Sequence, residues 1–276
     1  MLNGAVSAIL PGGRLHLQHG PIDLVIRAYG RDVEAAYHQA WTRFETILVE
    51  VVEELPALRR PGPVVVSGSV AMRMAAAIAP HSEFVTPMAA VAGSVADEVL
   101  DAMVAGCSLT KAYVNNGGDT ALYLSPGSEI HAGIEDDGPA GSITLRSSDP
   151  VRGIATSGWR GRSMSLGIAD AVTVLAKDAA SADVATTLIA NAVDLPGHPR
   201  IVREPAYARD PESDLGDRLA TVHVPELSDG EIAEALARGR AKALAMREAG
   251  LIAGANLRLQ GWADTLAYNE KEMSLA

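Results

Sequence analysis

Residues 112–124 read AYVNNGGDTALYL, in which two short apolar runs flank an Asn-Gly-Gly turn. Asn-Gly between apolar runs is the strongest short signal for a β-hairpin, because a type I′ turn needs positive φ at its central residues. Similar short runs follow at 130–134, 142–146 and 153–156, separated by Gly, Pro, Asp and Asn. This spacing predicts an antiparallel meander in the middle of the chain.

The N-terminal part of the chain predicts a second hairpin and a long helix. Residues 14–19 and 22–29 alternate apolar and polar side chains around a Gly-Pro pair, a pattern typical of paired strands. From Asp32 apolar residues recur every three or four positions until Pro56, which predicts an amphipathic helix capped by Asp32. Further along we expect helices at 69–78, 87–103, 181–193 and 228–249, strands at 171–176, 219–224, 257–260 and 262–266, and a loop at 194–217.

Length and composition indicate one folded unit. The chain has 276 residues, and no linker separates two self-sufficient halves, so we expect a single domain over residues 1–276. Hydrophobic residues make up 48% of the chain but aromatic ones only 4%, so the core must be built from Ala, Val, Leu and Ile. Together with the patterns above, this predicts an α+β fold in which the helices pack on one side of an antiparallel sheet.

Charge and cysteine content disfavour several classes of partner and compartment. The net charge of −11 argues against binding to nucleic acid or to an anionic membrane. No run reaches the ~18 apolar residues that span a bilayer, and Met1 to Val6 lack the basic residues of a signal peptide. The only cysteine, Cys107, cannot form an internal disulfide. We therefore expect a cytoplasmic protein, and the sequence leaves open whether it forms homo-oligomers.

The Asn-Gly-Gly segment has two interpretations. Asn115, Gly117, Gly118 and Asp119 are the residues expected of a tight turn between two strands. Adjacent glycines beside an acid also expose backbone N–H groups and let a ligand come close, as in anion-binding loops. The segment alone does not decide between a turn and a ligand loop.

A second polar segment follows the strand at 153–156. Thr156, Ser157 and Gly158 are followed by Arg160 and Arg162. Hydroxyls that donate hydrogen bonds and an arginine that adds charge can together hold a phosphate. The alternative is an ordinary exposed loop.

The third segment is a predicted helix that contains Asp183 and Thr187. Residues four apart lie on one face of a helix, so this carboxylate and this hydroxyl can reach one Mg²⁺, which prefers few protein oxygens plus ligand phosphates. Alternatively Asp183 is a first-turn acid favoured by the helix dipole, and Thr187 bonds back to the helix. Spacing alone cannot decide between the two.

Taken in order, these segments resemble the ApbE family of flavin transferases. The family's run consists of a small-residue helix ending in Asp, an Asn-x-Gly-Gly-Asp hairpin, Ala-Thr-Ser-Gly, a Thr-Val strand and an Ala-Asp-x-x-x-Thr helix. Similar residues lie here at 89–97, 115–119, 155–158, 172–174 and 182–187. Residues 161–170 also resemble a Ser- and Gly-rich stretch of a short, cytoplasmic, uncharacterised group of ApbE-like proteins.

The resemblance implies an ApbE-like, T-fold-related domain with a cleft for a flat heterocyclic ligand of the flavin type. The family's transferases bind FAD with Mg²⁺ near its pyrophosphate, and by resemblance the metal ligands here are Asp183 and Thr187. The two polar loops then line the cleft. The ligand-binding candidates are Asp97, Asn115, Gly117, Gly118, Thr156, Ser157, Gly158, Arg160 and Arg162, and the catalytic candidates are Asp119 and Asp170.

Two departures from the family pattern keep other functions open. Ala92-Gly93 stands where family transferases usually carry Lys-Gly, and their His-Ile-Ile-Asp-Pro segment is absent. One hypothesis is Mg²⁺-assisted cleavage of FAD, with FMN passed to a protein hydroxyl or to water. Another is an enzyme on a pterin-, folate- or purine-like ring, with Asp97, Asp119 or Asp170 recognising ring N–H groups or acting as acid or base. A third is a non-catalytic binder of such a ligand.

Overall fold

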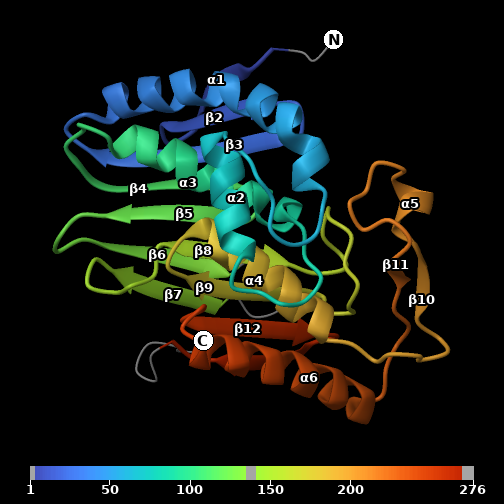
Figure 1. The fold of residues 1–276 in the computed structure, drawn as a ribbon. Coiled ribbons are helices and arrows are strands. Elements are labelled where there is room, and N and C mark those ends of the chain that lie inside the picture. Colours follow the sequence, from blue (N-terminus) through green and yellow to red (C-terminus); the bar gives the residue numbers. More distant parts are fainter. Residues whose placement is uncertain (1–3, 135–140, 269–276) are drawn as a thin grey trace.

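A large antiparallel sheet forms the centre of the protein (Figure 1). The structure, a computed structural model, describes residues 4–134 and 141–268. Within these residues the sheet has nine strands in the order β1-β2-β3-β4-β5-β8-β9-β12-β13, and every neighbouring pair is antiparallel. The strands are β1 (Val6–Leu10), β2 (Arg14–His19), β3 (Ile22–Gly30), β4 (Leu109–Asn116), β5 (Asp119–Leu124), β8 (Gly153–Ser157), β9 (Ala171–Ala176), β12 (Gly254–Leu259) and β13 (Trp262–Leu266).

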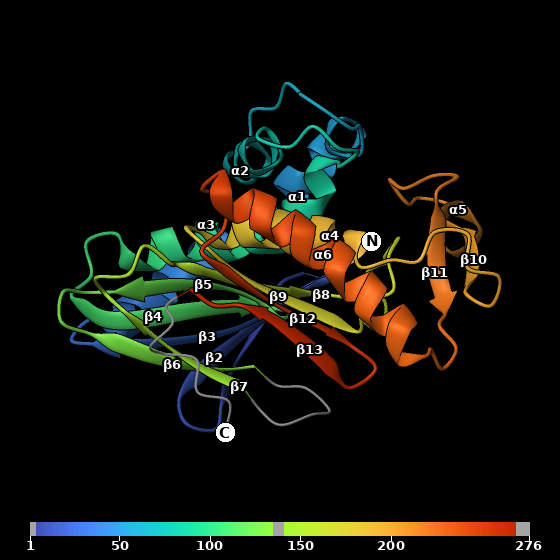
Figure 2. The ribbon, with the colours of Figure 1, turned by 90° about the horizontal axis from the view of Figure 1, so that it is seen from below.

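The helices cover one face of this sheet, as Figure 2 shows. They are α1 (Val33–Leu58), α2 (Ser69–Ile78), the 3₁₀ helix η1 (Pro87–Ala90), α3 (Val91–Val104), α4 (Ala179–Ala192) and α6 (Asp229–Glu248). A hairpin of β6 (Glu129–Ile134) and β7 (Gly141–Arg146) lies under the opposite face, which we call the open face. An arm of β10 (Val202–Pro205), α5 (Ala206–Arg209) and β11 (Leu219–His223) projects to one side. The predicted α+β arrangement, with helices on one side of an antiparallel sheet, is confirmed.

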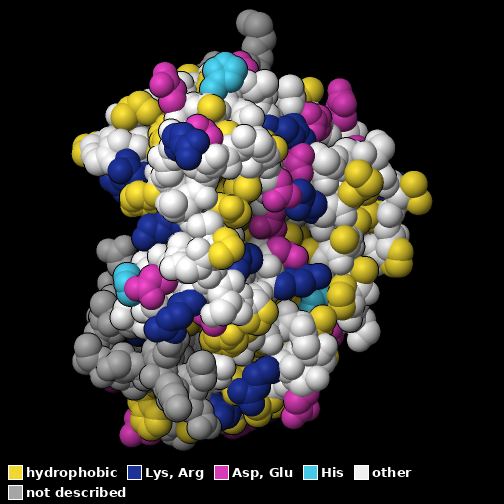
Figure 3. Space-filling model, turned by 90° about the vertical axis from the view of Figure 1, so that its left-hand side faces the viewer, with side chains coloured by type: hydrophobic (Ala, Val, Ile, Leu, Met, Phe, Trp, Pro, Cys, Tyr) yellow, Lys and Arg dark blue, Asp and Glu magenta, His cyan; other side chains and the backbone are white. Residues whose placement is uncertain are grey.

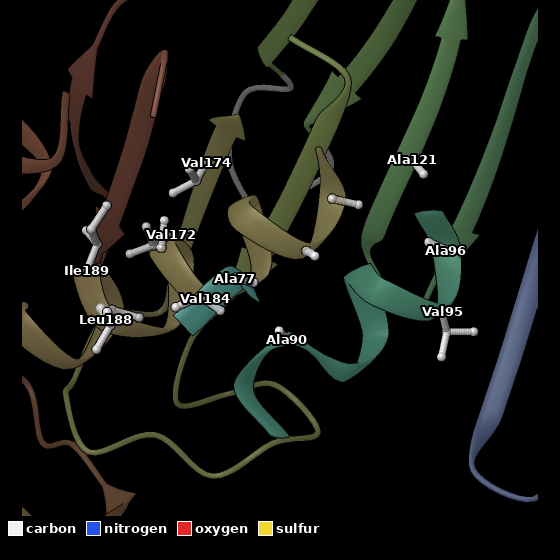
Figure 4. Close-up of a cluster of buried hydrophobic side chains, with 14 of the residues drawn as sticks. Ala77, Ala90, Val95, Ala96, Ala121, Val172, Val174, Val184, Leu188 and Ile189 are labelled. Atoms are coloured by element: carbon white, nitrogen blue, oxygen red, sulfur yellow. The ribbon is translucent and has the colours of Figure 1, made fainter. Parts of the chain in front are cut away.

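Small side chains build the core between helices and sheet. Figure 4 shows Ala90, Val95 and Ala96 of the η1–α3 segment, Ala121 of β5 and Val184 of α4, which belong to one cluster of buried side chains. All five are buried. A Cβ at Gly93 of α3 would collide with the backbone carbonyl of Ala179 at the start of α4. The two helices can therefore approach closely only because a glycine stands at this point.

The predicted meander is wrong for β6 and β7. These strands pair with each other in a separate two-stranded sheet, and β8 returns to lie beside β5. The physical reason is a second apolar cluster, in which Leu122 and Leu124 of β5 are buried against Ile143 and Leu145 of β7. The hairpin thus covers part of the open face instead of extending the main sheet.

Other differences are local. Helix α1 continues through Pro56, in its last turn, to Leu58. The expected loop at 194–217 contains strand β10 and helix α5, and strand β1 at the sheet edge was not predicted. Within the described residues, no helix is long and apolar enough to cross a membrane. On the face seen in Figure 3, basic and acidic side chains are interspersed.

Candidate functional site

A cleft of about 1490 Å³ brings the predicted polar segments together. Ligand pockets commonly measure about 300–1,000 Å³, so this cleft has room for more than a single heterocycle. Its lining residues come from the β4–β5 turn, the end of β8, helix α4, the open face of the sheet and the β6–β7 hairpin. Of the candidates, the lining includes Asn115, Gly117, Gly118, Asp119, Thr156, Ser157, Gly158, Arg162, Asp170, Asp183 and Thr187.

The β4–β5 turn is both a tight turn and a cleft wall. Gly117 and Gly118 have φ of 64° and 118°, conformations that side chains rarely adopt. The Asn115 side-chain amide donates to the Thr120 hydroxyl at 2.7 Å, which fixes the base of the hairpin. The Arg162 guanidinium lies against Gly117, where a Cβ would collide with it. Arginine and exposed glycine backbone therefore meet at one point of the cleft.

The end of β8 forms the neighbouring wall. The hydroxyls of Thr156 and Thr173 lie 2.9 Å apart across the β8–β9 pair. The backbone N–H of Thr156 donates to Oδ1 of Asp119 at 3.3 Å, which ties this wall to the β4–β5 turn. A Cβ at Gly158 would collide with the Asp170 carbonyl. The chain can therefore turn away from the sheet here only with glycine.

Two carboxyl groups of the cleft, those of Asp119 and Asp183, repel each other when both are charged. Burial raises the pKa of Asp119 to about 7, although the Thr156 N–H and the positive charge of Arg162 act to lower it. Burial raises the pKa of Asp183 well above its usual range, and the negative charge of Asp119 raises it further. The Gly93 N–H donates to Oδ2 of Asp183 at 3.0 Å and offsets only part of this penalty. Two such neighbours disfavour being charged together unless a cation lies between them.

The donor set at this point fits a hard cation. Asp183 and Thr187 stand one turn apart on α4, and both line the cleft together with Asp119. Mg²⁺ is commonly held by one or two carboxylates while waters and substrate phosphates fill its other positions. Among the described residues no group of three or more His, Cys, Asp or Glu could hold a metal ion. A site here therefore depends on this small oxygen set and on oxygens from a ligand.

Asp97 does not reach the cleft lining. Its two carboxyl oxygens accept hydrogen bonds from the backbone N–H groups of Ala179 and Ala180, at 3.1 and 2.9 Å. These are unpaired donors at the start of α4, which a carboxylate satisfies. Burial nevertheless raises the pKa of Asp97 to about 7. Asp97 of α3 therefore binds the start of α4, and it lies close enough to Asp183 to act on it electrostatically.

Asp170 and Arg160 are engaged with each other. The Asp170 carboxylate accepts hydrogen bonds from Arg160 Nε at 2.7 Å, Trp159 Nε1 at 3.1 Å and the Gln260 backbone N–H at 2.5 Å. Arg160 also stacks on the Trp159 ring, and it is not among the cleft-lining residues. Asp170 thus anchors the loop after β8 to the β12–β13 turn, and only Arg162 of the two arginines extends into the cleft.

The sequence patterns did not indicate the apolar part of the cleft. Ile130 and Ile143 of the hairpin line it opposite Tyr113, Leu122 and Ile154 of the open face. These residues looked like ordinary strand residues because their common surface forms only when the hairpin folds under the sheet. The arm adds Arg209, Asp210, Glu212, Ser213, Asp214 and Leu215 to the rim.

Comparisons with known proteins assign the chain to a family. The arrangement is that of an ApbE-like α+β protein. A family profile described as AbpE bacteria matches residues 7–265, and the chain belongs to this family. The predicted kinship is thereby confirmed.

Curated relatives match the chain over less than half of its length. The UPF0280 protein of Methanococcoides burtonii is 40% identical over 121 residues, which are 43% of this chain and 50% of the relative. That of Methanothermobacter thermautotrophicus is 37% identical over 143 residues, 49% of this chain and 53% of the relative. The chain thus spans about half the length of the curated relatives it matches.

Two solved structures are similar at low sequence identity. The apo form of the flavinyl transferase ApbE of Pseudomonas stutzeri is 12% identical, with a TM-score of 0.49 over 99% of this chain and 97% of that one. The ApbE protein of Thermotoga maritima is 11% identical, with a TM-score of 0.46 over 94% and 96%.

Proposed function

We propose that this protein is a Mg²⁺-dependent enzyme that cleaves the pyrophosphate of FAD and passes FMN to a protein hydroxyl or to water. The observation that carries the proposal is the pair Asp119 and Asp183, which lies in one large cleft with Arg162 and the Gly117-Gly118 turn. Such a cleft has room for a cation and for phosphate groups whose charge the cation neutralises. The order of motifs shared with the ApbE flavin transferases supports the same reaction.

Asp183 and Thr187 are the residues that would hold Mg²⁺. When bound, the metal supplies positive charge to the pyrophosphate oxygens as negative charge develops on the departing AMP phosphate. Burial is the main cause of the raised pKa values of Asp119 and Asp183, and the negative charge of Asp119 adds to the rise at Asp183. A cation between the two groups would offset both effects.

The other cleft residues position the phosphates. Arg162 and the backbone of Gly117 and Gly118 offer donors on one wall, and Ser157 with Thr156 offers hydroxyls on the other. In the reaction the acceptor oxygen bonds to the FMN phosphorus, the bond from that phosphorus to the bridging oxygen breaks, and AMP leaves with that oxygen. The proton of the acceptor hydroxyl goes to Asp119, which we assign as the acid–base group because it faces this point of the cleft.

The test is to incubate the purified protein with FAD and Mg²⁺ and to quantify FMN and AMP by chromatography and mass spectrometry. We expect FAD turnover that a chelator abolishes, and a loss of at least about a hundredfold in Asp183→Asn, as is typical when a main electrostatic contact of the transition state is removed. Asp229→Asn is the matched control, because Asp229 is an exposed acid in the first turn of α6. Equal turnover in both variants, or turnover that is independent of metal, contradicts the proposal.

A second candidate is an enzyme, or a non-catalytic binder, for a pterin-, folate- or purine-like ring in the same cleft. One observation favours it: Ala92 lines the cleft where family transferases usually carry lysine, so this wall presents a methyl group instead of an ammonium. Absorbance and mass spectrometry of any small molecule that copurifies with the protein distinguish the two. A flavin supports the first function, and a pterin or purine supports the second.

A further inference from the structure

A cluster of cations lies on the open face of the sheet, beside the part that the β6–β7 hairpin covers. We define the β2–β4 patch as Arg14, Arg27, Tyr29, Lys111 and Tyr113. In β3 the side chains that alternate with Arg27 and Tyr29 are buried toward the helices, so these two point to the open face. The register places Arg27 opposite Tyr113 and Tyr29 opposite Lys111, and Arg14 immediately precedes the Leu15–Ile26 pair of β2 and β3. The five side chains therefore form two adjoining rows on one surface.

The patch concentrates positive charge in a chain whose net charge is −11. The Arg27 guanidinium and the Lys111 ammonium lie 5.0 and 5.2 Å from the centre of the Tyr29 ring. Arg14 and Arg27 are close enough to Tyr113 to act on its hydroxyl electrostatically. Among the described residues, none of the three cations has a carboxylate within ion-pair distance.

Two acids near the patch in the described part of the chain, Asp23 and Glu129, have other partners. Asp23 of the open face bonds to His16 at 3.1 Å. Glu129 at the start of the hairpin lies 3.7 Å from Arg146, and only its backbone carbonyl accepts from Lys111. The backbone carbonyl of Gly12 accepts from Arg27 and so holds its guanidinium beside Tyr29. The cations are thus held in place, and no carboxylate among residues 4–134 and 141–268 forms an ion pair with them.

The patch adjoins the cleft, at a distance from the end of the cleft where Asp183 and Thr187 lie. Arg14 and Tyr113 line the cleft together with Ile130 and Ile143 of the hairpin. Tyr113 precedes Gly117 by four residues along β4 and its turn, which at ~3.3 Å per residue is about 13 Å. A phosphate held against Gly117 by Arg162 would therefore lie at one end of β4, and Lys111 lies toward the other end. The patch and the Gly117 turn are two separate cationic places, and the patch meets the cleft at Arg14 and Tyr113.

We propose that the β2–β4 patch binds an anionic arm of the cleft's ligand, carrying carboxylate or phosphate groups, at the end away from Asp183 and Thr187. The inference takes from the proposed function only a flat ring in the cleft, and it bears on the second candidate ligand rather than on FAD. FAD has its phosphates together in one place and does not need both sites. A ligand that uses the full cleft carries anionic groups on both sides of its ring, or a long arm that ends in them.

The first test uses two simple anions, glutarate as a dicarboxylate and inorganic phosphate, titrated into ¹⁵N-labelled protein at low salt. We expect shifts of the backbone amide signals of residues 27–29 and 111–113, and the stronger of the two anions identifies the chemistry of the arm. Removing two exposed charge contacts in Arg14→Gln/Lys111→Gln should weaken this binding roughly fivefold. Lys177→Gln/Arg247→Gln, which removes two exposed charges far from the patch, should leave it unchanged. Absence of these shifts with both anions, or equal weakening in both variants, overturns the proposal.

The second test titrates two ring compounds in the presence of Mg²⁺: folic acid, whose arm ends in a glutamate with two carboxylates, and pteroic acid, whose arm ends at a single benzoate. We expect the protein to prefer folic acid, and the preference to fall in the Arg14→Gln/Lys111→Gln variant alone. A preference that is unchanged in this variant overturns the proposal. If no ring compound binds while the anions still shift the β3 and β4 signals, the proposed function fails and the anion site stands.

Discussion

At the residue scale, the two arginines after β8 look equivalent in sequence but have different surroundings. Arg162 lies against Gly117 in the cleft, whereas Arg160 is paired with Asp170 and stacked on Trp159. A charge-assisted hydrogen bond to phosphate contributes about 1.5–3 kcal/mol. We therefore expect Arg162→Gln to raise the Kd for FMN at least about tenfold in a calorimetric titration. Arg160→Gln, the matched control, should leave this Kd unchanged and lower the Tm. Equal weakening by both variants contradicts this assignment.

The same scale explains which candidates could be found from sequence. The Asn115–Asp119 turn, the hydroxyls after β8 and the Asp183–Thr187 spacing are local patterns, and the fold brings them to one cleft. Asp97 could not be placed in this way, because its partners are Ala179 and Ala180, more than 80 residues further along the chain. Whether a carboxylate faces a ligand or caps a helix depends on which element packs against it.

At the scale of the element, we predict how the stability of helix α6 depends on pH. Its capping box joins Ser228 and Glu231, and His198 bonds to the same carboxylate at 2.8 Å. The Ser228 backbone N–H, with His198 and the Ser228 hydroxyl, lowers the pKa of Glu231 to about 2. A lowered carboxyl pKa means that the charged form stabilises the folded state. This stabilisation is present at a pH above the Glu pKa of the unfolded chain, near 4.5, and is lost as the pH falls toward 2. Glu231→Gln should thus be less stable than the parent at pH 6, and the difference should shrink at pH 2.5.

Urea unfolding followed by circular dichroism measures this difference. Glu248→Gln, in the last turn of the same helix, removes the same charge without touching the cap and should show no such convergence. A constant difference between parent and Glu231→Gln from pH 6 to 2.5 would mean that the carboxylate does not stabilise the helix.

Elements with a complete internal pattern were predictable, and those that depend on a distant partner were not. Helix α2 has the expected bounds, 69–78, because its apolar spacing lies within the element. Strand β1 is exposed along most of its length, so it shows no alternation of buried and exposed residues. The position of β6–β7 under the sheet depends on Leu122 and Leu124 of another strand, and no local pattern contains that information.

At the scale of the whole molecule, three carboxyl groups gathered between α3, α4 and the β4–β5 turn should set the pH dependence of stability. The pKa values of Asp97 and Asp119 are raised to about 7, and that of Asp183 is raised as well. A raised carboxyl pKa means that the folded state prefers the protonated form. This preference stabilises the folded state fully at a pH below the carboxyl pKa of the unfolded chain, near 3.8, and the stabilisation is lost as the pH rises through about 7. The free energy of unfolding should therefore be larger at pH 5.5 than at pH 8.

The Asp183→Asn variant isolates the contribution of the cleft pair, because asparagine can still accept from Gly93 but carries no charge. Its stability relative to the parent should rise from pH 5.5 to pH 8 in urea unfolding, because the parent loses stability as its buried carboxyl groups are forced to ionise, and Asp229→Asn should show no such rise. Mg²⁺ at a hundred times its Kd should add about 2.7 kcal/mol to the parent at pH 8 and nothing to Asp183→Asn. A parent that Mg²⁺ does not stabilise, with a pH dependence equal to that of the variant, would leave Asp183 as a buried acid of α4 without a cation.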